Sequence, residues 1–393
     1  MKLTHGGRSS ARRSPSASRT VKRVAALSGF ALTALFVTGC SPEEAVRFGW
    51  PAGVTPEGKS MLLLWQWAVI AALAMGILVW GLIFWTITFH RRKKNHDVLK
   101  NTDAEAEFPR QTGYNVPLEL AYTAIPFVLI AVLFYFTVIT QNTVEKREDN
   151  PAVVVDVTAF QWNWKFGYKS VESNDGALLI DPKDSKSGSP FDLKIKDYYE
   201  HEGEQEELMG PAGGRNQDVR DYLAFDQIEV LGTSSEIPIL LLPTNKRIQF
   251  DLAAADVIHS FWVPEFLFKR DLFPFPEQNH QDPSFQISEI DREGAFVGRC
   301  AEMCGTYHAM MNFEVRAVSP QVFDAYINWR KANPDATNAE ALTAVCQEPE
   351  SVVTVPFDTR RVATTDTPEY LGDATNTSTL GKGCTPAEGV NLS

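Results

Sequence analysis

Cys300, Cys304, His308 and Met311 fall within twelve residues of the chain. Thiolate, imidazole and thioether are soft ligands that suit copper, and a blue-copper site needs two histidines, one cysteine and a weak axial methionine. Cys304 and His308 lie inside this stretch, and His259 supplies a second imidazole upstream. One cysteine is therefore in excess of a single copper site. Two cysteines that face each other on one loop could bridge two copper ions, each capped by one histidine.

A Cys-x3-Cys pair has two other common uses, a disulfide and a zinc site. Zinc favours a closed tetrahedral set of nitrogen and sulfur ligands and has no use for Met311. The full set of side chains therefore favours copper over these two alternatives.

This pattern resembles subunit II of haem-copper cytochrome c oxidase, and the resemblance covers roughly residues 60 to 318. It implies a dinuclear copper A centre with the ligands His259, Cys300, Cys304, His308, Met311 and the backbone carbonyl of Glu302. In this family the two cysteines bridge two copper ions, each histidine caps one of them, and the last two ligands are weak and axial. The Glu302 side chain would in addition bind a magnesium ion shared with subunit I.

Trp162, in Gln-Trp-Asn-Trp, resembles an exposed tryptophan that receives electrons from cytochrome c in this family. Taken alone, a tryptophan on a strand is more often a core residue, and we expect that role for Trp164. The family usually has tyrosine where this chain has Asn163, so the aromatic path differs here.

Glu119 stands at the start of an apolar run, seven residues before Pro126. A carboxylate at a membrane helix end can simply reach for the interface, but an acid in or near a membrane is also a functional candidate. The segment around Glu119 resembles the one whose glutamate admits protons to the K-type channel of subunit I.

The resemblance implies subunit II of an aa3-type oxidase. Such a subunit accepts electrons from cytochrome c, either free or as a domain of a respiratory supercomplex, and passes them to haem a of subunit I. There haem a3 and copper B reduce oxygen to water, coupled to proton pumping. The other oxidase subunits and membrane lipid are further expected partners, and nothing in the sequence indicates nucleic acid.

Two other classes of protein share some of these features. A membrane-anchored copper chaperone also carries cysteines and a histidine, but it must release its metal and needs neither a methionine nor a second histidine cap. A quinol oxidase subunit II shares the helices and the barrel, but that branch has lost the copper cysteines.

Residues 1–39 resemble an export signal, because seven Lys or Arg and no acid precede a short apolar run. The residues Val-Thr-Gly-Cys that end at Cys40 resemble a lipobox, which would make Cys40 the lipidated first residue of a segment 40–60. Removal of the signal changes the net charge from -12 to -12 - 7 = -19. An acidic body of this kind would attract a basic electron donor.

Residues 61–89 and 118–140 are apolar runs that exceed the roughly 20 residues needed to span a bilayer. Basic residues follow the first run at once, and the positive-inside rule places them in the cytoplasm, within a loop 90–117. The second run returns the chain to the outside. We expect a multi-pass protein of the bacterial cell membrane with its copper domain on the outer side.

Residues 150–318 contain short segments with the alternation of β-strands, punctuated by proline and glycine. Strands are predicted from residue 153 and over 227–231, 237–242, 247–252, 285–290, 295–299 and 312–318. This pattern predicts an antiparallel Greek-key domain, and the resemblance makes it a cupredoxin-type barrel. The expected fold is therefore a hairpin of two transmembrane helices followed by an extracytoplasmic all-β barrel.

Two further segments flank or interrupt this barrel. Residues 169–225 carry thirteen acids against seven bases and several glycine and proline breakers, which predicts an insertion that is mostly loop, either solvated or used to bind a partner. Residues 319–393 form a C-terminal extension, helical up to about 345 and irregular beyond. Cys346 and Cys384 are the cysteines left over, and an even remainder in an exported protein suggests a disulfide, with two free thiols as the alternative.

Overall fold

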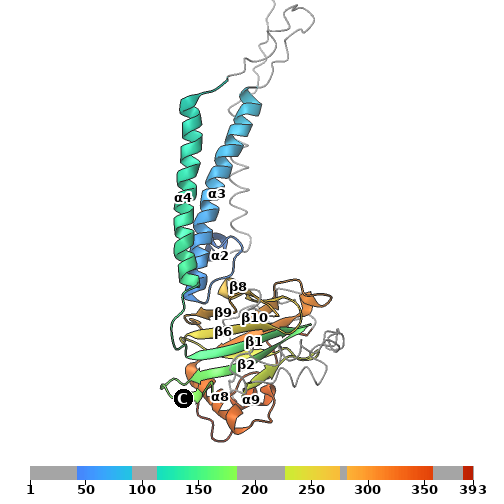
Figure 1. Ribbon diagram of the computed structural model, residues 1–393. Helices are drawn as coiled ribbons and strands as arrows, with labels where there is room; N and C mark the ends of the chain where they lie inside the picture. The colour runs from blue at the N-terminus through green and yellow to red at the C-terminus, as the bar shows by residue number, and fades with distance from the viewer. Residues whose placement is uncertain (1–41, 91–112, 184–225, 275–280, 357–383, 393) are drawn as a thin grey trace, which may run out of the picture. The chain divides into compact units, whose positions relative to one another are not determined.

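The computed structural model describes residues 42–90, 113–183, 226–274, 281–356 and 384–392 (Figure 1). Cys40, the basic residues after 90 and most of the predicted insertion lie outside the described residues. Residues up to Trp50 form one compact unit, of which the described part contains the short helix α2 (Pro42–Val46). All other elements belong to a second unit that starts at Pro51.

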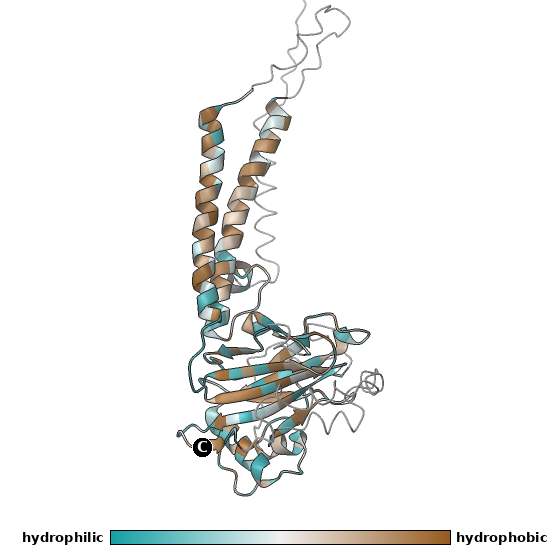
Figure 2. Ribbon diagram, viewed as in Figure 1, coloured by the Kyte–Doolittle hydropathy of each residue, from teal (hydrophilic) through white to brown (hydrophobic). Residues whose placement is uncertain are grey.

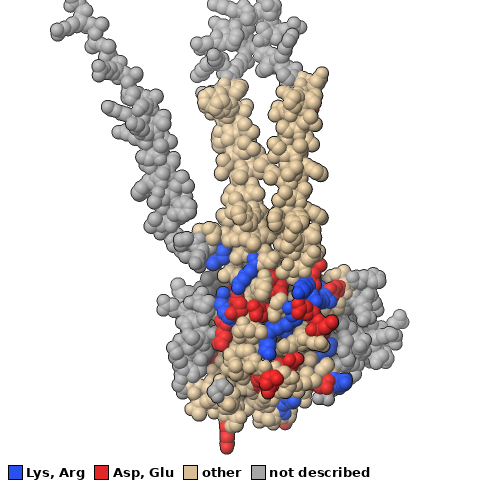
Figure 3. All heavy atoms as spheres, turned by 90° about the vertical axis from the view of Figure 1, so that its left-hand side faces the viewer, with Lys and Arg blue, Asp and Glu red and all other residues tan. Residues whose placement is uncertain are grey.

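Two long helices are apolar enough to cross a membrane, α3 (Pro56–Phe89) and α4 (Val116–Val144). Most residues of both helices are apolar in Figure 2, and on the face drawn in Figure 3 the Lys, Arg, Asp and Glu side chains gather on the β domain instead of along these helices. A helix that is apolar on every side is buried in protein or in lipid. Because α3 and α4 expose these side chains in the isolated chain, a bilayer or partner helices must cover them.

Both helices begin before the apolar runs that predicted them, because polar residues cap their first turns. The Thr55 side chain accepts a hydrogen bond from the Gly58 N–H at 2.9 Å, and Pro56 takes the first helical position. In α4 the same capping role falls to Asn115, whose side chain accepts from the Leu118 N–H. As a result, α3 begins five residues before the predicted start at 61, and α4 begins two residues before the predicted start at 118.

The β domain consists of two sheets (Figure 1). The first sheet contains β1 (Val153–Phe160), β2 (Asn163–Glu172), β3 (Leu178–Ile180), β4 (Glu229–Leu231), β6 (Ile248–Ala254) and β9 (Ser284–Ile287). Its order is β3-β2-β1-β6-β9, and β4 also pairs with β2. The second sheet has the order β5-β11-β10-β7-β8 and contains β5 (Ile239–Pro243), β7 (His259–Val263), β8 (Phe268–Leu272), β10 (Gly294–Cys300) and β11 (Asn312–Val318).

Strand pairing differs from the purely antiparallel arrangement that we expected. β1 runs parallel to β6, and β5 runs parallel to β11. Parallel neighbours cannot be joined by a tight hairpin turn. In both pairs here the two strands are far apart in the sequence, and other strands lie between them along the chain. The sequence also failed to predict β7 and β8. Strand β8 carries three charged residues in five, a composition tolerated at the edge of a sheet, where it lies.

Aromatic side chains fill the space between the two sheets. Trp164 of the first sheet packs against Phe313 of the second with ring centroids 4.9 Å apart, and Phe261 stacks on Phe313 at 4.9 Å. Trp164 is fully buried, which confirms its prediction as a core residue. Burying one such ring contributes roughly 1.5–3 kcal/mol, so this cluster helps to fix the two sheets face to face.

The first sheet extends into the segment that was predicted as an insertion. Strand β2 continues to Glu172 and β3 follows at Leu178–Ile180, so the start of 169–225 is strand and not loop. On the other side of the segment, Asp226 lies directly over Gly167 of β2. A Cβ atom on Gly167 would come within 1.7 Å of the Asp226 Oδ2 atom, so only glycine fits there.

The C-terminal extension is helical where the sequence predicted it, with α8 (Pro320–Ala332) and α9 (Asn338–Ala344). A disulfide joins Cys346 to Cys384, with Cα atoms 5.7 Å apart.

A buried ion pair on β11 holds the segment that follows these helices. Glu314 and Arg316 are both fully buried, and their Oε1 and Nη2 atoms lie 2.6 Å apart. The second Glu314 oxygen accepts from the Ser351 hydroxyl and from the Val352 N–H, each at 2.7 Å. Arg316 also donates to the carbonyl oxygens of Glu348 and Glu350.

Glu314→Ala should lower the free energy of unfolding by about 3–5 kcal/mol, because removing one partner leaves a buried, uncompensated charge on Arg316. Denaturant unfolding followed by tryptophan fluorescence measures this change. The exposed Glu236→Ala is the matched control and should change stability by less than about 0.5 kcal/mol. Equal effects of the two substitutions would show that the ion pair does not anchor the extension.

Candidate metal centre

The soft side chains singled out in the sequence meet at one end of the second sheet. His259 is the first residue of β7 and Cys300 the last residue of β10, and the two strands pair with Cys300 opposite Phe261. The Cys300 N–H donates to the Met311 carbonyl at 3.1 Å, which ties the far end of the loop to the same point. Backbone pairing therefore brings together residues that are 41 positions apart in the sequence.

Three potential ligand atoms, from His259, Cys300 and Cys304, all lie within 4.8 Å of one another. The two Sγ atoms are 3.8 Å apart, which is far longer than the roughly 2.05 Å of a disulfide bond. The disulfide alternative therefore does not hold in this structure. Both sulfurs could contact one metal ion at the usual distance of about 2.3 Å.

A second histidine, a thioether and a carbonyl complete the cluster. His308 places Nδ1 3.5 Å from the Cys304 Sγ, much as the His259 Nδ1 lies 3.8 Å from the Cys300 Sγ. The Met311 Sδ is 3.9 Å from the Cys304 Sγ, and the Glu302 carbonyl oxygen is 3.2 Å from the Cys300 Sγ. Each sulfur therefore has one imidazole and one weaker donor beside it, a set that suits copper better than a tetrahedral zinc site.

The loop between β10 and β11 can take this shape because of Gly305. Its backbone has a φ of +116°, and a Cβ atom there would lie 3.2 Å from the Gln161 side-chain nitrogen and from the Trp162 ring. A larger residue would be strained and would also push the loop away from β1 and β2. The close approach keeps Cys304 against the neighbouring sheet.

The two thiols hold one proton between them in the metal-free protein. A hydrogen bond from Cys304 lowers the pKa of Cys300 to about 3, and the same hydrogen bond raises the pKa of Cys304. For His259, burial acts to lower the pKa, but hydrogen bonds with Asp256 and Cys300 outweigh it and raise the pKa. The metal-free site therefore contains a thiolate on Cys300 and a protonated thiol on Cys304, at the position where a cation would bind.

Two residues that the sequence reading missed contact this cluster through side-chain hydrogen bonds. Asp256 Oδ1 lies 2.8 Å from the His259 Nε2, and the Gln161 amide donates to the Cys304 carbonyl at 2.8 Å. The spacing Asp-x-x-His, with a carboxylate three residues before a ligand histidine, was the available signal for Asp256. Nothing in the sequence marked Gln161 beyond its place next to Trp162.

Trp162 lies directly against the copper loop. Its indole Nε1 donates to the Cys304 carbonyl at 3.0 Å, and its ring meets Tyr307 edge to face with centroids 4.9 Å apart. Trp162 is half-buried, whereas Tyr307 is 41% exposed. Trp164, predicted only as core, also donates from its indole to the Met311 carbonyl.

Glu119 does not belong to this cluster. It lies in the first turn of α4, where its carboxylate accepts a hydrogen bond from the Asn115 N–H at 3.1 Å. The end of α4 at Val144, which leads to β1, is about 37 Å farther along the helix.

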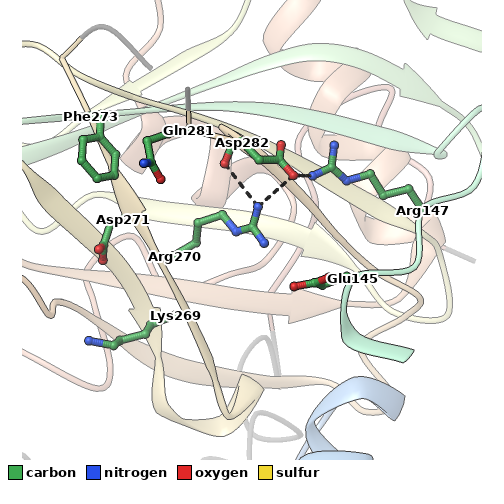
Figure 4. Close-up of a pocket in the computed structure, with 8 residues that line it drawn as sticks. All are labelled: Glu145, Arg147, Lys269, Arg270, Asp271, Phe273, Gln281 and Asp282. Atoms are coloured by element: carbon green, nitrogen blue, oxygen red, sulfur yellow. Dashed lines mark hydrogen bonds and ion pairs between the residues drawn. The ribbon is translucent and has the colours of Figure 1, made fainter. Parts of the chain in front are cut away.

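A polar pocket of about 560 Å³ lies where the segment after α4 meets β8 (Figure 4). Arg147 and Arg270 converge on the Asp282 carboxylate there, and Lys269, Asp271 and Glu145 complete the charged lining. Three cations balance three anions, and the two guanidinium groups are already paired. The pocket therefore serves to join the linker to the sheet, and we assign it no ligand.

Comparison with known proteins identifies the family. Residues 220–318 match the family described as cytochrome C oxidase subunit II, periplasmic domain. The chain is 55% identical over 347 residues to the probable cytochrome c oxidase subunit 2 of Nocardia farcinica, covering 87% of this chain and 90% of that protein. The chain belongs to the cytochrome c oxidase subunit II family.

Other members of the cytochrome c oxidase subunit II family are similar over comparable lengths. The cytochrome c oxidase subunit 2 of Mycobacterium bovis is 53% identical over 345 residues, covering 87% of this chain and 91% of that protein. Among solved structures, the periplasmic domain of subunit II from Bradyrhizobium japonicum has 20% identity and a TM-score of 0.27, over 47% of this chain and 96% of that chain.

Membership of the cytochrome c oxidase subunit II family confirms the resemblance seen in the sequence. The chain is a component of an oxidoreductase complex, and its two-sheet unit is the cupredoxin-type domain that was predicted beside two apolar helices. The cluster of His259, Cys300 and Cys304 gives it a site of the copper A kind.

Copper binding by this subunit II should strengthen as the pH rises. Cys304, whose pKa is raised by its hydrogen bond with Cys300, keeps its proton at neutral pH and must lose it before both sulfurs can bind metal. For one displaced proton the apparent affinity should increase about tenfold per pH unit. Competition with a chelator at several pH values, together with proton release on loading, measures this, and an affinity independent of pH would contradict it.

Proposed function

We propose that this chain is the electron-accepting subunit II of an aa3-type cytochrome c oxidase and holds a dinuclear copper A centre. The observation that carries the proposal is the pair of buried, unbridged cysteines with Sγ atoms 3.8 Å apart and one imidazole beside each. A single-copper site would need only one of these thiolates. The second thiolate has a clear use if both sulfurs bridge two ions.

Each ligand has a defined place in this proposal. Cys300 and Cys304 would hold the two ions through their thiolates and His259 and His308 through Nδ1, and Met311 and the Glu302 carbonyl would be weaker donors. When bound, the copper pair supplies a one-electron carrier whose charge is shared over two metals. The protein contributes a buried pocket, since His259, Cys300, Cys304 and Met311 are at most 7% exposed.

Trp162 and its neighbours form the proposed place of electron uptake. The Trp162 indole is joined by a hydrogen bond to the carbonyl of the ligand residue Cys304. Ile258, Met303 and Tyr307 are among the few large apolar side chains exposed on the described β domain, and each directly precedes a ligand in the sequence. An apolar surface around the shortest path to the ligands suits a donor that must come close.

Cytochrome c, free or as a domain of a supercomplex, is the proposed donor, and haem a of subunit I the acceptor. The acidic net charge of the chain would speed the encounter with a basic donor. Subunit I, with haem a3 and copper B, carries out oxygen reduction, and the Glu302 side chain provides a ligand to a magnesium ion shared with it. α3 and α4 contact subunit I, the other subunits or lipid.

Two proposed roles rest on the resemblance and on position. Glu119, at the cytoplasmic end of α4, provides the point at which protons reach the K-type channel of subunit I. Cys40, outside the described residues, is lipidated after removal of residues 1–39. In this proposal the copper domain lies outside a bacterial cell membrane, to which the lipid and two membrane-spanning helices anchor it.

The two other classes of protein fit the structure less well. A copper chaperone has no use for Met311 or for a second imidazole held 3.5 Å from the Cys304 sulfur. A quinol oxidase subunit lacks the copper cysteines, which here are buried and unbridged. The copper content of the purified protein separates the three: two tightly held ions, one labile ion or none.

Cys300→Ser and Cys304→Ser should each abolish the spectrum of an electron shared by two equivalent copper nuclei, because a hydroxyl does not replace a bridging thiolate. Electron paramagnetic resonance and metal analysis of the loaded protein measure this. The double variant Cys346→Ser/Cys384→Ser is the matched control and should keep two copper ions. A shared-electron spectrum in either single variant would rule out the bridging assignment.

Trp162→Ala should slow electron transfer from reduced cytochrome c by about 10- to 100-fold, the range seen when a partner of a metal ligand is lost. The copper spectrum should persist, because Trp162 itself is not a ligand. Stopped-flow reduction of the oxidase, at low and high salt, measures the rate. Trp329→Ala, on α8, is the control, and a Trp162 variant with normal rates would move electron uptake elsewhere.

A further inference from the structure

Asp256 occupies the turn between β6 and β7, three residues before His259, and its side chain is only 9% exposed. Three nitrogen atoms surround its carboxylate. Oδ1 lies 2.8 Å from the His259 Nε2 and accepts from the Val257 N–H at 2.7 Å. Oδ2 accepts from the Gln161 N–H at 2.6 Å.

The contact with His259 decides which imidazole nitrogen can bind metal. An ionised carboxylate only accepts hydrogen bonds, so the hydrogen of a neutral His259 ring must be on Nε2. The lone pair is then on Nδ1, which is the atom that faces the Cys300 Sγ at 3.8 Å. A carboxylate that holds the far nitrogen of a ligand histidine fixes both its tautomer and its orientation.

The contact with Gln161 extends this control to the other side of the centre. The backbone of Gln161 is held by Asp256, while its side-chain amide donates to the Cys304 carbonyl at 2.8 Å. The next residue, Trp162, donates to the same carbonyl at 3.0 Å. One carboxylate is thus linked through two adjacent residues to the second bridging cysteine, without any contact to the sulfur atoms themselves.

We infer that Asp256 is a positioning residue that aligns His259 for copper and, through Gln161, holds Trp162 against the loop of Cys304. This inference rests on the proposed copper function. Besides its turn neighbour Val257, Asp256 bonds a proposed copper ligand and the residue before Trp162. The two longer-range contacts, to His259 and to Gln161, distinguish the positioning role.

Asp256→Asn in the intact, copper-loaded oxidase is the main test. The substitution keeps the shape but replaces one acceptor oxygen by a donor amide, which must then face either the His259 Nε2–H or the Gln161 N–H. We expect copper to be lost to a chelator about 10- to 100-fold faster, the usual cost of removing such a partner. The histidine nitrogen couplings in the pulsed electron resonance spectrum should change as well.

Electron transfer gives a second readout. Asp256→Asn should lower the limiting rate of reduction by cytochrome c and leave the KM for cytochrome c within about twofold, because the exposed side chains Ile258, Met303 and Tyr307 are unchanged. Asp251→Asn is the matched control: that aspartate is also buried and is bonded to Lys169, Gln249 and Ser284, on the first sheet. It should leave copper retention and spectrum unchanged.

Gln161→Ala separates the contact of Asp256 with His259 from its link to Cys304 through Gln161. It also provides a test if the Asp256 variant fails to fold. It removes the side-chain bond to the Cys304 carbonyl but keeps the backbone N–H that Asp256 accepts. The transfer rate should fall while the His259 couplings stay as in the wild type.

Wild-type copper lifetime and histidine couplings in Asp256→Asn would overturn the inference, and so would a Gln161→Ala variant with normal transfer rates. A wild-type protein that binds no copper pair would instead refute the proposed function. The two failures are therefore distinguishable in the same set of samples.

Discussion

The pairing of β7 with β10 is the constraint on which the metal centre depends. It sets the first residue of one strand, His259, beside the last residue of the other, Cys300. Because Met311 closes the loop with a backbone hydrogen bond to Cys300, the remaining ligands are held on a short and anchored segment. A slip of one residue in this register would turn alternate side chains to the other face of the sheet and separate the imidazole from the thiolate.

The same arrangement concentrates ionisable groups at one end of the second sheet. A thiolate, a thiol and a histidine are gathered where little water can reach them, and hydrogen bonds between the sulfurs and with the Asp256 carboxylate stabilise their charged forms. A cation that binds this folded cluster has no such preformed site in the unfolded chain, so metal binding and stability are coupled. The aromatic core around Trp164 and Phe313 provides the burial energy that keeps the ligands in place meanwhile.

Much of this molecule could be predicted from local sequence, because soft ligands are rare and apolar spans are long. The cysteine, histidine and methionine candidates, the two helices and the strands around 248 and 312 follow from residue type and periodicity, whereas the Glu302 carbonyl was implied by the family resemblance. Strands β7 and β8 could not be predicted in this way. Strand β8 carries Lys269, Arg270 and Asp271 in a row, and its strand structure depends on pairing with β7. Parallel pairing and the contact of Gln161 with Cys304 are long-range features that no sequence window contains.

The bond between Cys346 and Cys384 makes the C-terminal region a closed ring, because the chain returns to its own starting point after 38 residues. A protease that cuts once inside the ring would open it without releasing a fragment. Nicked and intact protein would have the same mass in a non-reducing gel apart from one water molecule, and would separate only after reduction. A single cut in this region would therefore leave the two pieces of the chain joined by the disulfide.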